Sequence, residues 1–210
     1  MNSTEETYFF DFNNPKIKGI TSQFININSK TELIESLYIY VRDNWRYSPF
    51  NIGLKKEHFK ASNITDKEDG HCIDKAIVYI ACLRAFNIPA RLHLAKVSNH
   101  IATERLEKII GTNQLAPHGL VDVFHNNKWV KCSPAFNKEL CKLYNVDTLE
   151  FNGTKDSVLQ EFNKSNDKFM SYLEDYGSFE DVPLDFIKET FKSNYPNFYD
   201  KYKNLDQIII

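Results

Sequence analysis

The sequence predicts an α+β fold, in which helices and strands are segregated along the chain. Two helical patterns come first, an extended stretch and a β-hairpin follow, and a polar, aromatic region with helical spacing ends the chain. A parallel α/β fold would instead show strands and helices in regular alternation. The segregated order therefore indicates an α+β protein with a helical C-terminal extension.

The N-terminal third contains one clear helix. Residues 1–29 alternate Phe and Ile with polar side chains, which predicts an irregular arm with short strands. Residues 31–46 carry apolar side chains at helical spacing, and Ser29 or Thr31 is suited to cap the helix. A polar loop is predicted at 47–69.

The strongest helical pattern covers residues 72–86, where apolar side chains recur every three to four positions. Asp69 or Gly70 is suited to start this helix. Asn87 favours the left-handed conformation that ends a helix. The sequence therefore predicts a helix with Cys72 at its beginning.

A strand and a hairpin are predicted next. Residues 90–97 alternate as a strand. The segments 119–124 and 128–132 flank the dipeptide Asn126-Asn127, which suits a two-residue hairpin turn. These segments would supply an antiparallel sheet.

Composition and charge exclude several kinds of protein. With 26 basic and 28 acidic residues, the net charge of −2 does not suit a nucleic-acid-binding surface. No apolar run approaches the ~20 residues that cross a bilayer, and the polar, acidic start is unlike a secretory signal. We therefore expect a cytoplasmic protein that has reduced cysteines and binds neither nucleic acid nor membrane. Among its four cysteines no CxxC pair occurs, so we expect no metal and no cofactor.

Cys72 and His118 are the candidate reactive pair. A thiol is nucleophilic as thiolate, and both a helix N-terminus and a nearby imidazolium lower its pKa. Unpaired N–H groups of the first helical turn are also suited to bind an oxyanion. His118 opens the predicted hairpin, a rigid position for a general base. Taken alone, a cysteine at a helix start and a histidine on a strand are more often core or surface residues than catalytic ones.

The residues around this pair resemble the transglutaminase-like superfamily. The run that resembles the family's nucleophile helix is Gly70-His-Cys72-Ile-Asp-Lys-Ala76, followed by Leu83-Arg-Ala-Phe-Asn-Ile-Pro-Ala-Arg91. The run that resembles its histidine strand is His118-Gly-Leu-Val-Asp-Val-Phe, and Lys128-Trp-Val130 contains the tryptophan of the next strand. The run that resembles its leading helix is Tyr38-Ile-Tyr-Val-Arg-Asp-Asn-Trp-Arg-Tyr47. The resemblance implies a papain-like core, in which the nucleophile helix packs on an antiparallel sheet. It assigns the nucleophile to Cys72 and the base to His118.

The resemblance covers about residues 31–137. We therefore expect a single domain over 1–210, with a transglutaminase-like core at 31–137 and a mostly helical extension at 138–210.

The third catalytic position departs from the family pattern. Related sequences place Asp-Pro four residues after the tryptophan, and here that place reads Ser133-Pro134. In the predicted hairpin, His118 would face Ala135, with Ser133 and Asn137 as diagonal neighbours on the same face. We take Ser133 as the residue that orients His118, and Asn137 as its rival.

Two further residues are candidates for the substrate cleft. Trp45 is suited to form a wall or an oxyanion donor, although core packing is the commoner role for a tryptophan. His100 lies in a loop before the histidine strand. His71 is a neighbour of Cys72 in sequence and is disfavoured as the base, since adjacent side chains rarely point to the same spot.

The predicted function is thiol-dependent acyl transfer on an amide or peptide bond of a peptide or protein substrate, through an acyl-enzyme at Cys72. Hydrolysis is favoured over transamidation, because the long flanking domains of crosslinking transglutaminases are not seen in the chain. The alternative is a catalytically weakened binding or scaffold module, which the missing acid favours. A redox or thiol-sensing role is disfavoured, since no second cysteine lies near Cys72 in sequence.

Overall fold

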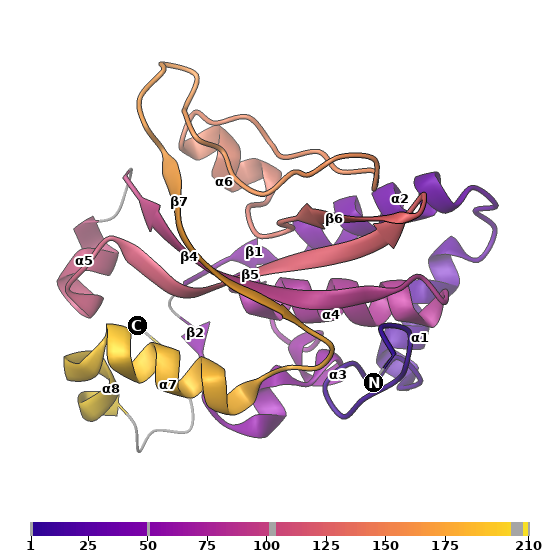
Figure 1. Cartoon of the computed structure of the whole chain (residues 1–210), viewed down its shortest axis with the longest axis horizontal. Coiled ribbons are helices and arrows are strands. Elements are labelled where there is room, and N and C mark those ends of the chain that lie inside the picture. The colour runs from indigo at the N-terminus through magenta and orange to yellow at the C-terminus, as the bar shows by residue number, and fades with distance from the viewer. Residues whose placement is uncertain (1, 50, 101–103, 203–207, 210) are drawn as a thin grey trace.

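The computed structural model of the chain describes residues 2–49, 51–100, 104–202 and 208–209. Its helices (Figure 1) are α1 (Pro15–Thr21), η1 (Ser22–Phe24), α2 (Lys30–Asn44), η2 (Lys56–Phe59), α3 (Ala61–Ile64), α4 (Cys72–Ala85), α5 (Glu104–Ile110), α6 (Lys138–Leu143), α7 (Leu184–Asn194) and α8 (Pro196–Tyr202). Its strands are β1 (Arg46–Tyr47), β2 (Asn51–Ile52), β3 (Asp69–Gly70), β4 (Ala90–Asn99), β5 (Gln114–His125), β6 (Lys128–Cys132), β7 (Met170–Phe179) and β8 (Ile208–Ile209).

The centre of the molecule is a curved antiparallel sheet of four strands in the order β6-β5-β4-β7. Helix α4 runs along one face of this sheet (Figure 1), and its residues are buried from Cys72 to Arg84. A helix that is apolar on most sides belongs inside a core rather than at the surface. The α+β class and the nucleophile helix packed on an antiparallel sheet are therefore confirmed.

The predicted hairpin is confirmed in its register. His125 pairs with Lys128, and Asn126 and Asn127 both have positive φ angles, 50° and 60°. Two positive φ angles are what a two-residue hairpin turn requires, and asparagine tolerates them well.

The N-terminal arm differs from the prediction of short strands. Asn14 caps α1 by accepting a hydrogen bond from the Lys16 N–H, and Pro15 occupies the first helical position. Proline is favoured there because its missing N–H costs nothing. Helix α2 is confirmed, with Ser29 as its cap.

The stretch 138–210 contains the expected helices α6, α7 and α8, but it is not mostly helical. Residues 144–169 lack helix, and strand β7 pairs with β4 as the edge of the central sheet. Most β7 side chains are only half-buried or exposed, so the strand has no strong apolar alternation to reveal it. The sheet of the core is thus completed by the C-terminal part of the chain.

Lys75, in the first turn of α4, ties three segments together. Its buried ammonium donates to the carbonyls of Arg42 at 2.7 Å, Trp45 at 2.9 Å and Ala135 at 2.7 Å, which uses all three of its donors. Burial lowers the pKa of Lys75 to about 7. The contacts hold the end of α2 and the segment after β6 against the beginning of α4.

Candidate active site

Cys72 is the first residue of α4, and His71 caps the helix. The Nδ1 of His71 accepts hydrogen bonds from the N–H groups of Ile73 at 3.1 Å and Asp74 at 3.3 Å, and the Asp74 carboxylate accepts one from the His71 N–H. The expected caps were wrong, because Asp69 and Gly70 are extended and pair with β1. His71 is thereby held as a cap.

This cap changes which N–H groups can face a substrate. The first-turn N–H groups were expected to bind an oxyanion, but the His71 ring already accepts hydrogen bonds from those of Ile73 and Asp74. The N–H of Cys72 precedes them and is the first-turn donor closest to the thiol in sequence.

The strand that carries His118 meets the thiol directly. The Gly119 N–H donates to the Cys72 Sγ at 3.3 Å. A Cβ at Gly119 would lie 2.8 Å from the Cα of Ile73, so only glycine permits this approach of β5 to the first turn of α4. His118, the preceding residue on this strand, is buried.

Burial sets the protonation of both groups. It raises the pKa of Cys72 to about 11, although the N–H groups of Gly119, Ile73 and Cys72 favour the thiolate. Burial, with a smaller contribution from His71, lowers the pKa of His118 to about 4. Both groups are therefore neutral at pH 7. The expected lowering of the thiol pKa by the helix N-terminus is wrong for this structure, because desolvation of the charged form is the larger effect.

Alkylation of Cys72 by iodoacetamide should therefore accelerate by about tenfold per pH unit between about pH 7 and 10, because only the thiolate reacts. The rate at Cys72 is measured by peptide-resolved mass spectrometry. A plateau already reached at about pH 6 would instead show a preformed thiolate–imidazolium pair and contradict these pKa directions.

Neither candidate for the orienting residue is hydrogen-bonded to the His118 Nδ1. Within the described part of the chain, the Nδ1 of His118 is buried without a hydrogen-bond partner. The Asn137 side chain accepts from the Tyr47 N–H at 3.0 Å and donates to Glu139 at 2.7 Å. The backbone of Ser133 is also engaged: its N–H donates to a loop carbonyl and its carbonyl accepts from a tyrosine hydroxyl.

The predicted diagonal contacts required the hairpin to continue as far as residue 137. The pairs between β5 and β6 end at Val121 and Cys132 instead. The Ser133 N–H turns away from β5 and donates to the Ser157 carbonyl at 3.0 Å. The assignment of Ser133 or Asn137 as orienting residue therefore remains a prediction without a contact behind it.

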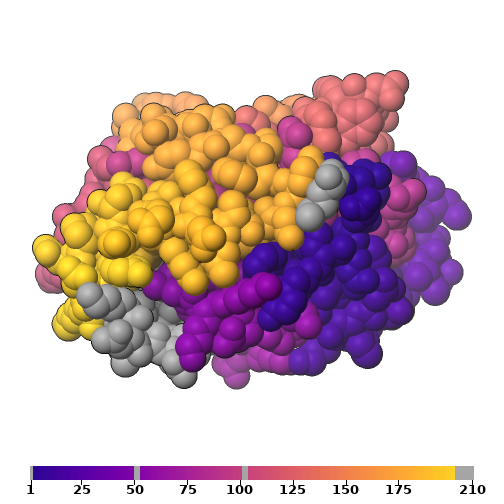
Figure 2. Space-filling view, turned by 60° about the horizontal axis from the view of Figure 1, so that its bottom comes forward, coloured from indigo at the N-terminus to yellow at the C-terminus, as the bar shows by residue number. Residues whose placement is uncertain are grey.

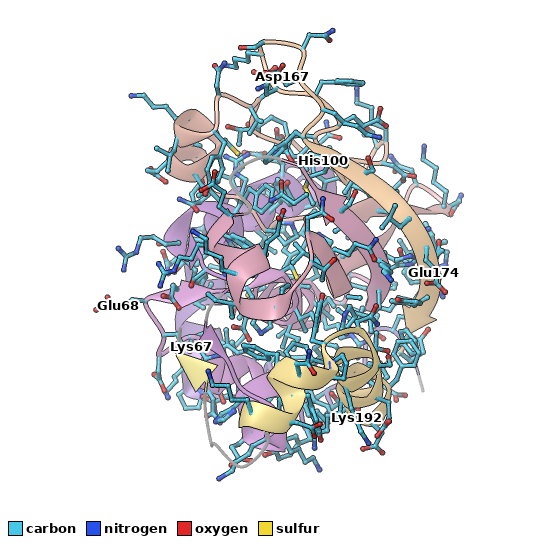
Figure 3. The ribbon with its side chains drawn as sticks, turned by 90° about the vertical axis from the view of Figure 1, so that its left-hand side faces the viewer. Lys67, Glu68, His100, Asp167, Glu174 and Lys192 are labelled. Atoms are coloured by element: carbon cyan, nitrogen blue, oxygen red, sulfur yellow. The ribbon has the colours of Figure 1, made fainter. Side chains whose placement is uncertain are left out.

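The two cleft candidates lie elsewhere. Trp45 is buried, and its ring lies 6.1 Å from that of Tyr40. It is not among the residues that line the pocket beside Cys72, which is described next. His100 is exposed, and its Nε2 lies 2.9 Å from the Ser98 Oγ. Figure 3 shows His100 well away from Lys192 of helix α7.

A small pocket of ≈ 80 Å³ opens beside the thiol. Its lining residues come from six parts of the chain: Tyr47 with Pro49, Leu54 with Phe59, His71 with Cys72 and Ile73, Leu106 with Ile110, Leu115 with Ala116 and Pro117, and Ile187 with Phe191 and Tyr195. Ile187, Phe191 and Tyr195 were not predicted from the sequence as residues of the site. The helical spacing of Ile187, Phe191 and Tyr195 signals a buried face, but not which part of the core it covers.

Two other kinds of site are not found in the described residues. No group of three or more His, Cys, Asp or Glu side chains is arranged to hold a metal ion. No helix there is both long and apolar enough to cross a membrane.

Comparison with known proteins concerns the family and the fold. No curated protein matches the chain. A crystal structure from Cytophaga hutchinsonii, described as a "putative cysteine protease", shares the fold with a TM-score of 0.51 and 14% identity. The match covers 88% of this chain and 48% of that one, so this chain spans about half the length of that protein. The family model of the transglutaminase-like superfamily matches residues 19–134. The chain belongs to the transglutaminase-like superfamily.

Proposed function

We propose that the protein transfers acyl groups from amide or peptide bonds to water, through an acyl-enzyme at Cys72. The observation that carries the proposal is the hydrogen bond from the Gly119 N–H to the Cys72 Sγ, 3.3 Å long, which brings the histidine strand to the start of α4. Family membership and the fold shared with a described cysteine protease support a thiol-based activity.

The proposed chemistry uses the neutral forms of both groups. His118 accepts the thiol proton as the Cys72 sulfur attacks the carbonyl carbon, and the oxyanion forms beside the Cys72 N–H. Collapse breaks the C–N bond, and the leaving amine takes the proton from His118. Water then attacks the thioester while His118 removes its proton. The acid leaves, and the proton returns to the Cys72 sulfur.

Water as the acceptor is supported by the fold shared with a protein described as a cysteine protease, since a protease transfers acyl groups to water. To test this, an activated ester such as p-nitrophenyl acetate is offered with and without a primary amine, using Cys72→Ala as the control. The carboxylic acid should be the main product in both cases. An amide as the main product would identify a transamidase instead.

A second candidate is a binding module that has lost most of its catalytic power. One observation favours it: the Nδ1 of His118 has no hydrogen-bond partner among the described residues. A base without an orienting group can adopt the wrong tautomer, which costs up to ~10⁴ in rate in a serine-protease triad. This candidate predicts that Cys72 is acylated equally slowly in the natural protein and in His118→Ala.

A further inference from the structure

We infer that the residue whose acyl group is transferred to Cys72 has an aliphatic side chain. This side chain would be held in the pocket beside Cys72, part of whose wall is formed by helix α7. The inference rests on the proposed function and specifies its substrate. It departs from a glutamine-type substrate, whose side chain ends in a polar amide.

The pocket is apolar because distant parts of the chain converge on it. Aliphatic and aromatic side chains supply most of its wall, among them Leu54, Leu106, Ile110, Leu115, Ile187 and Phe191. Among the described residues that line it, none is an acid, a lysine or an arginine. Leu106, Ile187 and Phe191 are buried, so their side chains already belong to the packed interior.

Two of the polar groups in the wall already have partners in the protein. The Tyr195 hydroxyl accepts from the Ala116 N–H at 2.6 Å and donates to the Gln114 carbonyl at 2.8 Å. The His71 Nδ1 is used by the helix cap. A polar amide in the pocket would therefore lose its bonds to water with few replacements, a cost of about 1–3 kcal/mol by protein mutational data. An aliphatic side chain would lose none.

The volume also limits the side chain. A cavity of about 150 Å³ holds benzene in an engineered protein. The pocket here measures ≈ 80 Å³, which suits an aliphatic side chain better than an aromatic one.

The part of the wall made by α7 lies outside the residues that match the superfamily, 19–134. Ile187 and Phe191 occur one turn apart on α7, and Tyr195 follows at its C-terminal end. Figure 2 shows that the C-terminal residues, coloured orange and yellow, form a large part of one face of the molecule. The specificity we infer thus depends on this C-terminal segment together with the residues of the matched core.

The chain offers a matched control on the same helix. The Phe186 ring packs against Tyr176 and Phe179, with centroids 5.5 Å and 5.4 Å apart, and it does not line the pocket. Phe191→Ala and Phe186→Ala make the same chemical change in α7, but only the first enlarges the pocket.

The kinetic test compares the p-nitrophenyl esters of N-acetyl-leucine, N-acetyl-phenylalanine and N-acetyl-glutamine. The natural protein should acylate Cys72 from the leucine ester about 10- to 100-fold faster, in kcat/KM, than from the glutamine ester. Phe191→Ala should raise the phenylalanine-to-leucine ratio by about tenfold, while Phe186→Ala leaves this ratio unchanged. Equal rates for leucine and glutamine, or equal ratios in the two variants, would overturn the inference.

A binding test separates this inference from the proposed function. Cys72→Ala protein is titrated calorimetrically with N-acetyl-leucinamide and N-acetyl-glutaminamide. The leucine compound should bind about tenfold more tightly, and Phe191→Ala should weaken its binding, because the enlarged pocket no longer packs against the side chain. Equal binding would overturn the inference. Selective binding with no acylation of Cys72 in the natural protein would instead refute the proposed function and leave the aliphatic pocket standing.

Discussion

Replacement of His118 by alanine is expected to lower the rate of Cys72 acylation by about 10²- to 10⁴-fold, the usual contribution of a general base. The effect should be large because burial raises the pKa of Cys72 to about 11, so the thiol rarely ionises on its own at neutral pH. The measurement is kcat/KM with an activated ester at pH 7.

The control for this variant is His100→Ala. His100 is exposed and does not line the pocket beside Cys72, so its loss should change the rate by less than about twofold. A rate for His118→Ala that matched the natural protein would remove His118 from the mechanism. If His71→Ala then lost the activity, His71 would take its place.

Gly119→Ala is expected to have the second large effect. The added Cβ would lie 2.8 Å from the Cα and 2.9 Å from the backbone N of Ile73, and backbone atoms of a helix cannot rotate away. Strand β5 must therefore move off α4, which breaks the contact between the Gly119 N–H and the Cys72 Sγ. We expect a loss of about 1–3 kcal/mol in the free energy of unfolding, as for other overpacked cores, together with loss of ester turnover.

Gly19→Ala is the matched control. Nothing lies within 4 Å of a Cβ built at Gly19, which is in helix α1, so alanine should stabilise this helix slightly. Chemical denaturation and ester turnover are measured for both variants. If Gly119→Ala retained the stability and the turnover of the natural protein, the close approach of β5 to α4 would not be needed for the site.

The elements with local signals were predictable from the sequence. Ser29 before an apolar periodic stretch marks the start of α2, and Asn126-Asn127 marks a hairpin turn whose register follows from its length. Cys72 at a helix start and His118 before the hairpin were found in the same way. In the structure, Gly119, the residue after His118, donates its N–H to the Cys72 Sγ.

What could not be predicted depends on contacts between distant residues. Gly70 was expected only as a possible start of the nucleophile helix, and a Cβ there would come no closer than 3.2 Å to the Asp74 side chain. The tighter requirement, at Gly119, exists only because β5 crosses the start of α4. The role of strand β7 likewise depends on its pairing with β4, and the role of Phe191 on the pocket that it lines.

The direction of the thiol pKa was missed for a similar reason. A helix N-terminus favours the thiolate, and this part is visible in sequence. Burial of Cys72 comes from segments as far away as Tyr195, whose residues share the pocket wall with it. Desolvation is therefore a property of the whole fold, and no local pattern reports it.

The central claim is that Cys72 forms the acyl-enzyme, and peptide-resolved mass spectrometry of the protein quenched during ester turnover tests it most directly. Cys82, Cys132 and Cys141 serve as internal controls, because they are buried and free and line neither pocket. We expect an acyl group on Cys72 alone, which hydroxylamine removes as it does a thioester and which is much reduced in His118→Ala. Turnover without an acyl group on Cys72, or acylation spread over the four cysteines, would contradict it.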